Sequence, residues 1–274
     1  MEKKEKVVLI TGASAGIGEA TAILMKKAGF IVYAAARRVD RMRKLEKFGI
    51  QILDLDVTVE ESMVKCANII LAKHGALDVL VNNAGYGSYG AMEDIPMEEA
   101  KKQFEVNVFG LARMTQLFLP SMRKQGSGKI INVSSIGGKI GSPHGVWYQG
   151  SKFAVEGMSD SLRMELKQFN IDVVVIEPGA IKTEWSEITQ ENMLKISGQS
   201  EYGKNIKIHA DNLAKYDNMG SDPLVIAKGI LKASTARKPK TRYAIGKGVS
   251  VMLFLKNILP DRLFDRFMMK MLLN

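Results

Sequence analysis

The chain has 274 residues, of which 46% are hydrophobic and 25% are charged. This balance is typical of a globular protein that buries a full core, and it excludes a disordered or fibrous chain. The formal net charge is +10, and we expect no nucleic-acid partner.

Cysteine and histidine usage restricts the compartment and the kinds of site. Cys66 is the single cysteine, so an internal disulfide is impossible and a reducing compartment is expected. The start of the chain, MEKKEK, runs directly into VVLI without the pattern of a signal peptide. His74, His144 and His209 stand far apart and lack companion ligands at metal-binding spacing. We therefore expect a cytoplasmic protein without a structural metal.

Apolar, β-rich runs recur along the chain and predict buried strands. They lie at residues 7–10, 31–36, 50–55, 79–81, 130–133 and 173–176. Helical patterns lie between them, and the clearest runs from Phe104 to Met122 with apolar residues at steps of three and four. This alternation predicts an α/β fold, a doubly wound and mostly parallel sheet with helices on both faces and a ligand site at the carboxyl ends of the strands.

Two segments interrupt the alternation. Residues 182–222 contain no convincing strand and are too long for an ordinary connection, so we interpret them as a substrate lid. Residues 223–274 hold eleven Lys or Arg against two Asp, a net charge of +9 that is nearly the whole excess of the chain. We divide the chain into a catalytic domain at 1–247, which includes the lid, and an amphipathic helical extension of the same domain at 248–274.

A glycine-rich turn, TGASAGIG, follows the first predicted strand and precedes a helical pattern. Glycines let the backbone approach a phosphate, and a helix N-terminus offers unpaired N–H groups and a positive dipole. The turn therefore predicts a dinucleotide site, although Gly12, Gly16 and Gly18 are spaced differently from the G-x-G-x-x-G pattern.

Tyr148 and Lys152 stand four residues apart, which in a helix places them on one face. An ordinary tyrosine has a pKa of about 10, so proton exchange near neutral pH needs the pKa to fall by ~3, or about 4 kcal/mol. A lysine at ~5 Å supplies roughly 3 kcal/mol at an effective dielectric of ~20. The pair is either a device that lowers the pKa of the phenol or an exposed helix pair without chemistry, and the other motifs decide between these.

Four separated motifs resemble the short-chain dehydrogenase/reductase family over almost the entire chain. They are TGASAGIG, then Asn82-Asn83-Ala84-Gly85, then Ser135, and finally Tyr148-x-x-x-Lys152. The C-terminal region is similar to the hydroxysteroid and retinol dehydrogenase-like branch. The resemblance implies a Rossmann-type single domain that transfers a hydride between a nicotinamide cofactor and a carbonyl or alcohol.

The resemblance also implies the catalytic roles. Tyr148 is the general acid or base, and Lys152 lowers the pKa of Tyr148 and binds the nicotinamide ribose. Ser135 donates a hydrogen bond to the substrate oxygen. Asn107 kinks its helix and holds a water that relays protons to the lysine; the alternative is an exposed asparagine on a polar face.

The cofactor is predicted to be NADP(H) rather than NAD(H). The second predicted strand ends in Ala36-Arg37-Arg38, without a carboxylate until Asp40, and a guanidinium can bind the 2′-phosphate bidentately. Arg37 is the first choice, supported by Ser14 and Arg38; the alternative is a solvated helix entry. The resemblance implies further contacts at Gly12, Ser14, Gly16, Ile17, Gly18, Asp56, Val57, Asn83, Ala84, Gly85, Pro178, Gly179, Ile181 and Thr183, besides Tyr148 and Lys152.

These features together predict an NADP(H)-dependent carbonyl reductase or alcohol dehydrogenase with a small-molecule substrate. A catalytically silent NADP-binding regulator of the same fold and a sugar-nucleotide epimerase or dehydratase are the alternatives. The complete Ser135, Tyr148 and Lys152 set disfavours the first, and the short C-terminal region disfavours the second. A bulky lipophilic substrate is suggested by candidate pocket residues, namely Met92, Ile136, His144, Trp147, Trp185 and Met193.

Two surfaces are predicted to meet partners. The helices after Pro96 and Tyr148, with Phe109 and Phe153, resemble the pair through which relatives form homodimers or homotetramers. A C-terminal helix carries its apolar side chains on one side and its charges on the other, which is typical of a helix in a membrane interface. Packing of that side on the substrate cleft or a neighbouring subunit is favoured over peripheral membrane contact. The apolar side comprises Leu263, Phe264, Phe267, Met268, Met271 and Leu272.

Overall fold

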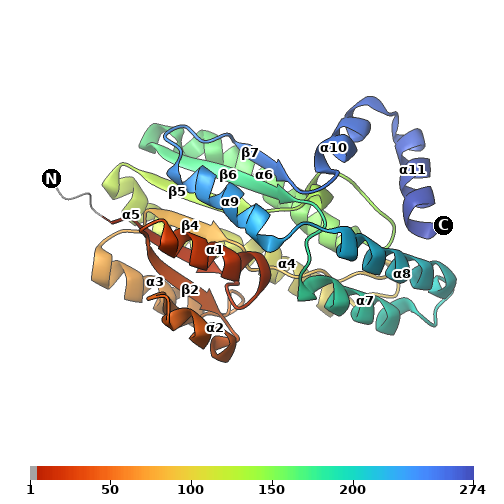
Figure 1. Ribbon diagram of the computed structural model, residues 1–274, viewed down its shortest axis with the longest axis horizontal. Helices are drawn as coiled ribbons and strands as arrows, with labels where there is room; N and C mark the ends of the chain where they lie inside the picture. Colours follow the sequence, from red (N-terminus) through yellow and green to blue (C-terminus); the bar gives the residue numbers. More distant parts are fainter. Residues whose placement is uncertain (1–4) are drawn as a thin grey trace.

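The computed structural model describes residues 5–274, without the side chains of residues 216–218. At its centre is a seven-stranded sheet in which every pair is parallel, in the order β3-β2-β1-β4-β5-β6-β7 (Figure 1). The strands are β1 (Val7–Thr11), β2 (Ile31–Ala36), β3 (Gln51–Asp54), β4 (Val79–Asn82), β5 (Gly128–Val133), β6 (Ile171–Pro178) and β7 (Arg242–Ile245). The predicted doubly wound fold is confirmed, and β7 is an addition to the predicted strands.

Helices cover both faces of the sheet because alternate strand residues point to opposite sides. Val8 and Ile10 of β1 join a core that includes α1 (Gly16–Lys27), α2 (Val39–Glu46) and α9 (Pro223–Thr235). Val7 and Leu9 join a second core on the other face. The helices there are α3 (Glu60–His74), α5 (Leu111–Gln125) and α6 (Val146–Leu166).

The strand order reverses direction between β1 and β4, which creates a crevice at the carboxyl ends of the strands. The glycine turn follows β1, the two arginines follow β2, the Asn-Asn-Ala-Gly segment follows β4, and Ser135 follows β5. The fold therefore brings motifs that are distant in sequence to one edge of the sheet.

The apolar stripe from Phe104 to Met122 is divided among three segments and is not one regular helix. They are α4 (Met97–Phe104), a π-helical segment η1 (Glu105–Gly110), and α5. A π-helical turn adds a residue to the helical repeat and is frequent at functional sites. Gly110 allows close packing here, since a Cβ on it would stand 2.5 Å from the carbonyl oxygen of Val57.

The segment predicted as a lid forms two helices, α7 (Glu184–Ser197) and α8 (Gly203–Met219). Its two ends lie side by side, because Ile181 pairs with Ser221 in an isolated parallel bridge. Two 3-10 turns, η2 (Ile136–Gly138) and η3 (Lys167–Phe169), flank α6.

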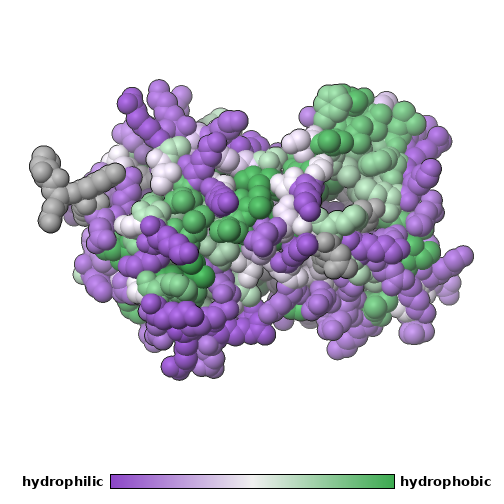
Figure 2. Space-filling model, viewed as in Figure 1, coloured by the Kyte–Doolittle hydropathy of each residue, from purple (hydrophilic) through white to green (hydrophobic). Residues whose placement is uncertain are grey.

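The chain ends in a helical hairpin, α10 (Val249–Ile258) and α11 (Asp261–Leu273), which projects at the upper right of Figure 1. Figure 2 shows hydrophobic side chains gathered over this projection. Across the described part of the chain, no helix combines the length and apolar character needed to cross a bilayer.

Candidate active site

The glycine turn connects β1 to α1 with almost no free space around it. A Cβ on Gly12 would come within 2.8 Å of the Cα of Ala84, and a Cβ on Gly18 would stand 2.5 Å from the carbonyl oxygen of Gly12. These two positions therefore require glycine. The N-cap residue of α1, Ala15, provides no side-chain cap, so N–H groups in the first helical turn remain for another acceptor.

The segment after β4 braces this turn through side-chain hydrogen bonds. The Asn83 amide donates to the carbonyl oxygens of Thr11 at 2.9 Å and Gly12 at 3.2 Å. The Thr11 hydroxyl accepts from the N–H groups of Asn83 and Ala84, each at 3.0 Å. All four bonds are donated by the segment after β4 and accepted by Thr11 and Gly12, which fixes the position of the turn at the floor of the crevice.

The end of β2 presents arginines to the same crevice. Arg38 donates to the Ser14 hydroxyl at 3.3 Å, and its guanidinium lies 3.4 Å from Glu184 of the lid. Arg41 also pairs with Glu184, at 2.6 Å. Arg37 is exposed and has no ion pair among the described residues, yet it is close to Tyr86, whose pKa is raised by burial and lowered by the Arg37 charge. Arg37 is therefore the more available of the two adjacent arginines for an anionic ligand.

The predicted contacts around β3 lie beside the glycine turn with different exposures. Asp56 closes a turn, since its carboxylate accepts from the N–H and hydroxyl of Thr58 at 2.9 and 2.7 Å. Val57 is buried, and Ile17 packs partly buried against the core from α1. Asp56 is half-buried, and both of these bonds go to the same carboxylate oxygen, Oδ1.

The predicted contacts after β6 lead from that strand into the segment predicted as a lid. Pro178 ends β6, and Gly179 donates its N–H to the last residue of β7 at 3.0 Å. Ile181 is buried, and Thr183 caps α7 by accepting from an N–H of that helix at 3.3 Å. A Cβ on Gly16 would meet the Thr183 methyl at 3.0 Å, so the start of the lid lies over the glycine turn.

Ser135, Tyr148 and Lys152 come together at the end of β5. Ser135 follows the strand, and the other two project from consecutive turns of α6. Tyr148 and Lys152 are 8% and 7% exposed, and the ammonium lies 5.9 Å from the phenol ring centre. Lys152 donates to the carbonyl oxygen of Val133 at 3.0 Å, which anchors its side chain beneath the tyrosine.

The protonation of the pair differs from the sequence prediction. Burial raises the pKa of Tyr148 to about 12, against a hydrogen bond with Ser135 that lowers it. Burial also lowers the pKa of Lys152 to about 8, against the charge of Glu156, which raises it. The predicted fall of the Tyr148 pKa toward neutrality is therefore wrong, because the loss of water disfavours the phenolate and outweighs the contributions that lower the pKa. At neutral pH the phenol therefore keeps its proton.

Asn107 lies in the π-helical segment and is buried. The alternative prediction, an exposed asparagine on a polar face, is therefore wrong. Its amide accepts from Tyr86 N at 3.1 Å and donates to Tyr86 O at 3.0 Å. It also donates to the Ser151 hydroxyl at 3.0 Å. A Cβ on Gly85 would lie 3.0 Å from the Asn107 oxygen and 3.6 Å from the Lys152 ammonium, so all three groups adjoin.

Aromatic side chains from α7 and a nearby loop surround Tyr148. The ring of Tyr148 lies 5.4 Å from Tyr89 and 5.3 Å from Trp185, centre to centre. Met193 is fully buried in the same cluster. Tyr89 was missed by the sequence analysis, because a single tyrosine in a loop gives no periodic signal.

The other candidate pocket residues lie in different surroundings from one another. Met92 is 58% exposed and does not belong to this cluster, so its prediction is wrong. Trp147 packs edge-on against Phe104 at 6.5 Å, on the α4 side of α6. The imidazole of His144 lies 3.0 Å from that of His209 through their Nδ1 atoms, where burial lowers the pKa of His209 to about 4.

A buried charge cluster lies one helical turn beyond Lys152 and was also missed. Glu156 accepts from Arg242 at 3.0 Å and pairs with Lys139 at 3.1 Å. Glu177 lies 3.3 Å from Arg242 and 3.9 Å from Lys139. Burial, together with the charge of Glu156, raises the pKa of Glu177 to about 7. The cluster connects α6 to β6 and β7 close to Lys152.

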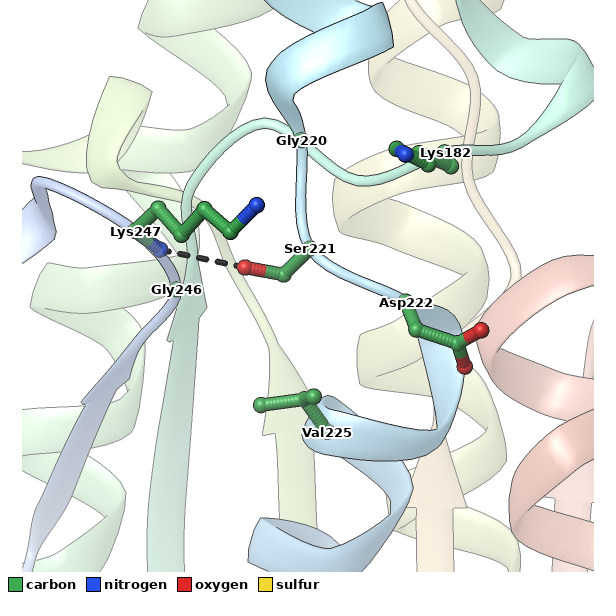
Figure 3. Close-up of a pocket in the computed structure, with 7 residues that line it drawn as sticks. All are labelled: Lys182, Gly220, Ser221, Asp222, Val225, Gly246 and Lys247. Carbon is green, nitrogen blue, oxygen red and sulfur yellow. Dashed lines mark hydrogen bonds between the residues drawn. The ribbon is translucent and has the colours of Figure 1, made fainter.

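A separate hollow of about 570 Å³ lies at the hinge of the lid (Figure 3). The Lys247 N–H donates to the Ser221 hydroxyl at 3.1 Å within it. No catalytic candidate lines this hollow, so we place the chemistry elsewhere, beside Tyr148. The lining residues are Lys182, Gly220, Ser221, Asp222, Val225, Gly246 and Lys247.

Comparisons with known proteins agree with this arrangement. The model of the short chain dehydrogenase family matches residues 6–193. The uncharacterized oxidoreductase YusZ of Bacillus subtilis is 37% identical, covering 98% of this chain and 99% of that protein. The 3-ketodihydrosphingosine reductase of Bacteroides thetaiotaomicron is 36% identical, covering 95% of each. The NADPH-dependent 3-dehydrocapnine reductase of Ornithobacterium rhinotracheale is 32% identical, covering 97% and 96%.

Solved structures share the fold. A short-chain dehydrogenase from Streptomyces avermitilis is 32% identical with a TM-score of 0.81, covering 93% of this chain and 92% of that one. A metagenomic short-chain oxidoreductase in complex with NADP is 26% identical with a TM-score of 0.69, covering 88% and 96%. One from Burkholderia phymatum in complex with NAD is 22% identical with a TM-score of 0.76, covering 88% and 90%. The fold thus accepts either cofactor.

Proposed function

This chain belongs to the short-chain dehydrogenase family, and from that premise we propose that it is an NADP(H)-dependent reductase of bulky lipophilic carbonyl compounds. The observation that carries the proposal is the meeting of half-buried Ser135 with buried Tyr148 and Lys152, with a phenol that keeps its proton at neutral pH. A protonated phenol is suited to donate a proton to a carbonyl oxygen, which is the direction of reduction.

The residues of the crevice fit a dinucleotide phosphate. The glycine turn excludes side chains where a pyrophosphate would approach, and α1 begins without a side-chain cap. Arg37 would meet the 2′-phosphate, with Ser14 and Arg38 beside it, because a guanidinium recognises phosphate bidentately. The absence of a carboxylate directly after β2 and the name of the 3-dehydrocapnine reductase, an NADPH-dependent relative, support this preference.

The protein side chains would share the remaining work of the reaction. A bound nicotinamide supplies the hydride that reduces the carbonyl carbon. Ser135 donates a hydrogen bond to the carbonyl oxygen, and Tyr148 transfers its proton to that oxygen. Lys152 stabilises the phenolate that remains, because its ammonium lies beneath the ring. Asn107 holds the loop after β4 against α6 and fixes the position of the lysine.

The surroundings of Tyr148 support a lipophilic substrate. Tyr89, Trp185 and Met193 form an apolar cluster with the phenol ring. Ile136, which follows the catalytic serine, packs with the C-terminal hairpin in a second apolar cluster. The relatives named 3-ketodihydrosphingosine reductase and 3-dehydrocapnine reductase support a keto substrate.

Oxidation of NADPH by the purified protein, followed with a panel of ketones, tests the proposal. The panel should pair long-chain ketones with short polar ketones, and each should be measured with NADPH and with NADH. We expect kcat/KM to be about tenfold or more higher for long-chain ketones, since each buried methylene contributes to binding. Ser135→Ala is the matched control and should slow every productive substrate. NADPH binding without turnover of any carbonyl would instead favour a silent regulator.

A further inference from the structure

The C-terminal hairpin has two apolar faces, and the fold uses one of them. Phe264, Met268 and Leu272 of α11 are buried against Ile140 in the loop after β5. Part of the predicted apolar side is therefore buried within the chain, against the loop that follows Ser135. The other residues of the predicted apolar side are not all buried, since Leu263 and Phe267 are exposed.

The second face points to solvent, and we call it the apolar face of the hairpin. On α10 it comprises Val251, Phe254 and Ile258, which are 63%, 61% and 55% exposed. Their spacing of three and four residues places them on one side of the helix. Leu263 and Phe267 continue it on α11, and Figure 2 shows the hydrophobic surface over both helices. An exposed patch of this kind indicates an interaction site.

The basic residues beside the apolar face indicate an anionic partner. Arg262, Arg266 and Lys270 are exposed on α11 and have no ion pair among the described residues. Lys256 is paired with Asp261 at 2.7 Å, which leaves Asp265 as the other acidic residue of the hairpin. The hairpin therefore keeps a positive charge beside its apolar face. Aromatic and aliphatic side chains flanked by basic ones match the boundary between lipid headgroups and acyl chains.

The hairpin is connected to both sides of the candidate substrate cleft. Ile136 and Ile140, which follow Ser135, belong to the cluster that holds α11. The Asn212 amide of the lid helix α8 donates to the carbonyl oxygen of Leu272 at 3.1 Å. A partner surface that binds the apolar face of the hairpin would therefore lie close to α8 and to the loop that follows Ser135.

We propose that the α10–α11 hairpin docks on the surface of an anionic membrane, with its apolar face at the headgroup–acyl boundary and its arginines on lipid phosphates. Docking places the cleft beside the bilayer, from which a lipophilic ketone reaches Tyr148. The delivery step depends on the function proposed above, whereas the docking itself does not.

Co-sedimentation with vesicles tests the docking. The full chain is mixed with vesicles of phosphatidylcholine alone or of equal phosphatidylcholine and phosphatidylglycerol, at low and high salt. We expect the parent protein to bind the anionic vesicles and to be released by salt. Phe254→Glu/Ile258→Glu should reduce the bound fraction at least about tenfold, because carboxylates would enter the apolar boundary. Arg262→Gln/Arg266→Gln should weaken binding to anionic vesicles only.

The matched control is Phe48→Glu/Ile69→Glu, which makes the same change at exposed apolar residues just after α2 and in α3, two helices that lie away from the hairpin in Figure 1. It should bind as the parent does. Equal binding of the Phe254→Glu/Ile258→Glu variant and the parent, or no binding by the parent, overturns the proposal. So does a fall in mass of that variant in light scattering without lipid, which would assign the face to a second copy of the chain.

Turnover of a water-soluble ketone separates this proposal from the proposed function. The Phe254→Glu/Ile258→Glu variant should keep the parent rate on such a ketone and lose rate on a vesicle-embedded ketone. A parent protein that binds vesicles but reduces no ketone would retain the docking and overturn the enzymatic function.

Discussion

Glu177→Gln should make the protein more stable at about pH 8 while leaving its stability at about pH 4 nearly unchanged. Glu177 is 3% exposed in β6 and faces a second carboxylate, Glu156. Arg242 and Lys139 lie at 3.3 and 3.9 Å, but Arg242 is also committed to Glu156. Burial and the neighbouring carboxylate therefore leave the charged form of Glu177 poorly compensated. Glutamine keeps the shape of the side chain and removes its titration.

The size of the effect follows from the pKa of Glu177, which rises from 4.5 to about 7 on folding. The folded protein retains a proton between these pH values that the unfolded chain releases. The stabilisation is thus fully present below about pH 4.5 and is lost as pH rises through about 7. At about 1.4 kcal/mol per pH unit, the loss amounts to about 3 kcal/mol.

Urea unfolding of the parent and of Glu177→Gln between about pH 4 and pH 8, at one protein concentration, measures the difference. We expect the free energy of unfolding of the variant to exceed that of the parent by about 3 kcal/mol at the alkaline end. Glu165→Gln makes the same change at an exposed helix residue and serves as the control. A difference between Glu177→Gln and the parent that stays constant with pH would refute the reasoning.

Three further predictions concern the cofactor, the lid and the assembly. Arg37→Asp should weaken NADPH binding by about 2 kcal/mol, or roughly thirtyfold, and leave NADH binding nearly unchanged; equal losses in binding titrations would exclude Arg37 as the phosphate ligand. Gly87→Ala should lower kcat/KM about tenfold without unfolding, because the new methyl would strike the ring of Trp185 and displace it from Tyr148; unchanged kinetics would contradict this. Phe153→Asp, at a residue 48% exposed on α6, should reduce the mass measured by light scattering, whereas a parent that is already a monomer would contradict the predicted interface.

The sheet and the order of the motifs were predictable because buried parallel strands leave continuous apolar runs in the sequence. β7 left no such signal, since Arg242–Ile245 is a short edge strand of mostly half-buried residues. The resemblance implied a kink at Asn107, where the helix is π-helical, but the hydrogen bonds of Asn107 to Tyr86, 21 residues earlier, left no signal in the sequence.

Motif spacing predicted which residues the fold brings together at the candidate site, but it did not predict their electrostatics. The pKa of Tyr148 depends on how completely the lid aromatics exclude water from the phenol, and this is a property of the folded protein. Glu156 and Glu177 lie on α6 and β6, so their proximity also requires the tertiary fold. In the sequence, each resembles an ordinary charged residue.

Turnover of Tyr148→Phe with NADPH and a long-chain ketone tests the central claim that this phenol is the general acid. The substitution removes one oxygen and keeps the ring that packs against Tyr89 and Trp185. We expect NADPH affinity and the urea unfolding midpoint to match the parent, and kcat to fall by about a thousandfold, within the range for loss of a general acid. A variant that binds NADPH and reduces the ketone at a rate comparable with the parent would contradict the assignment.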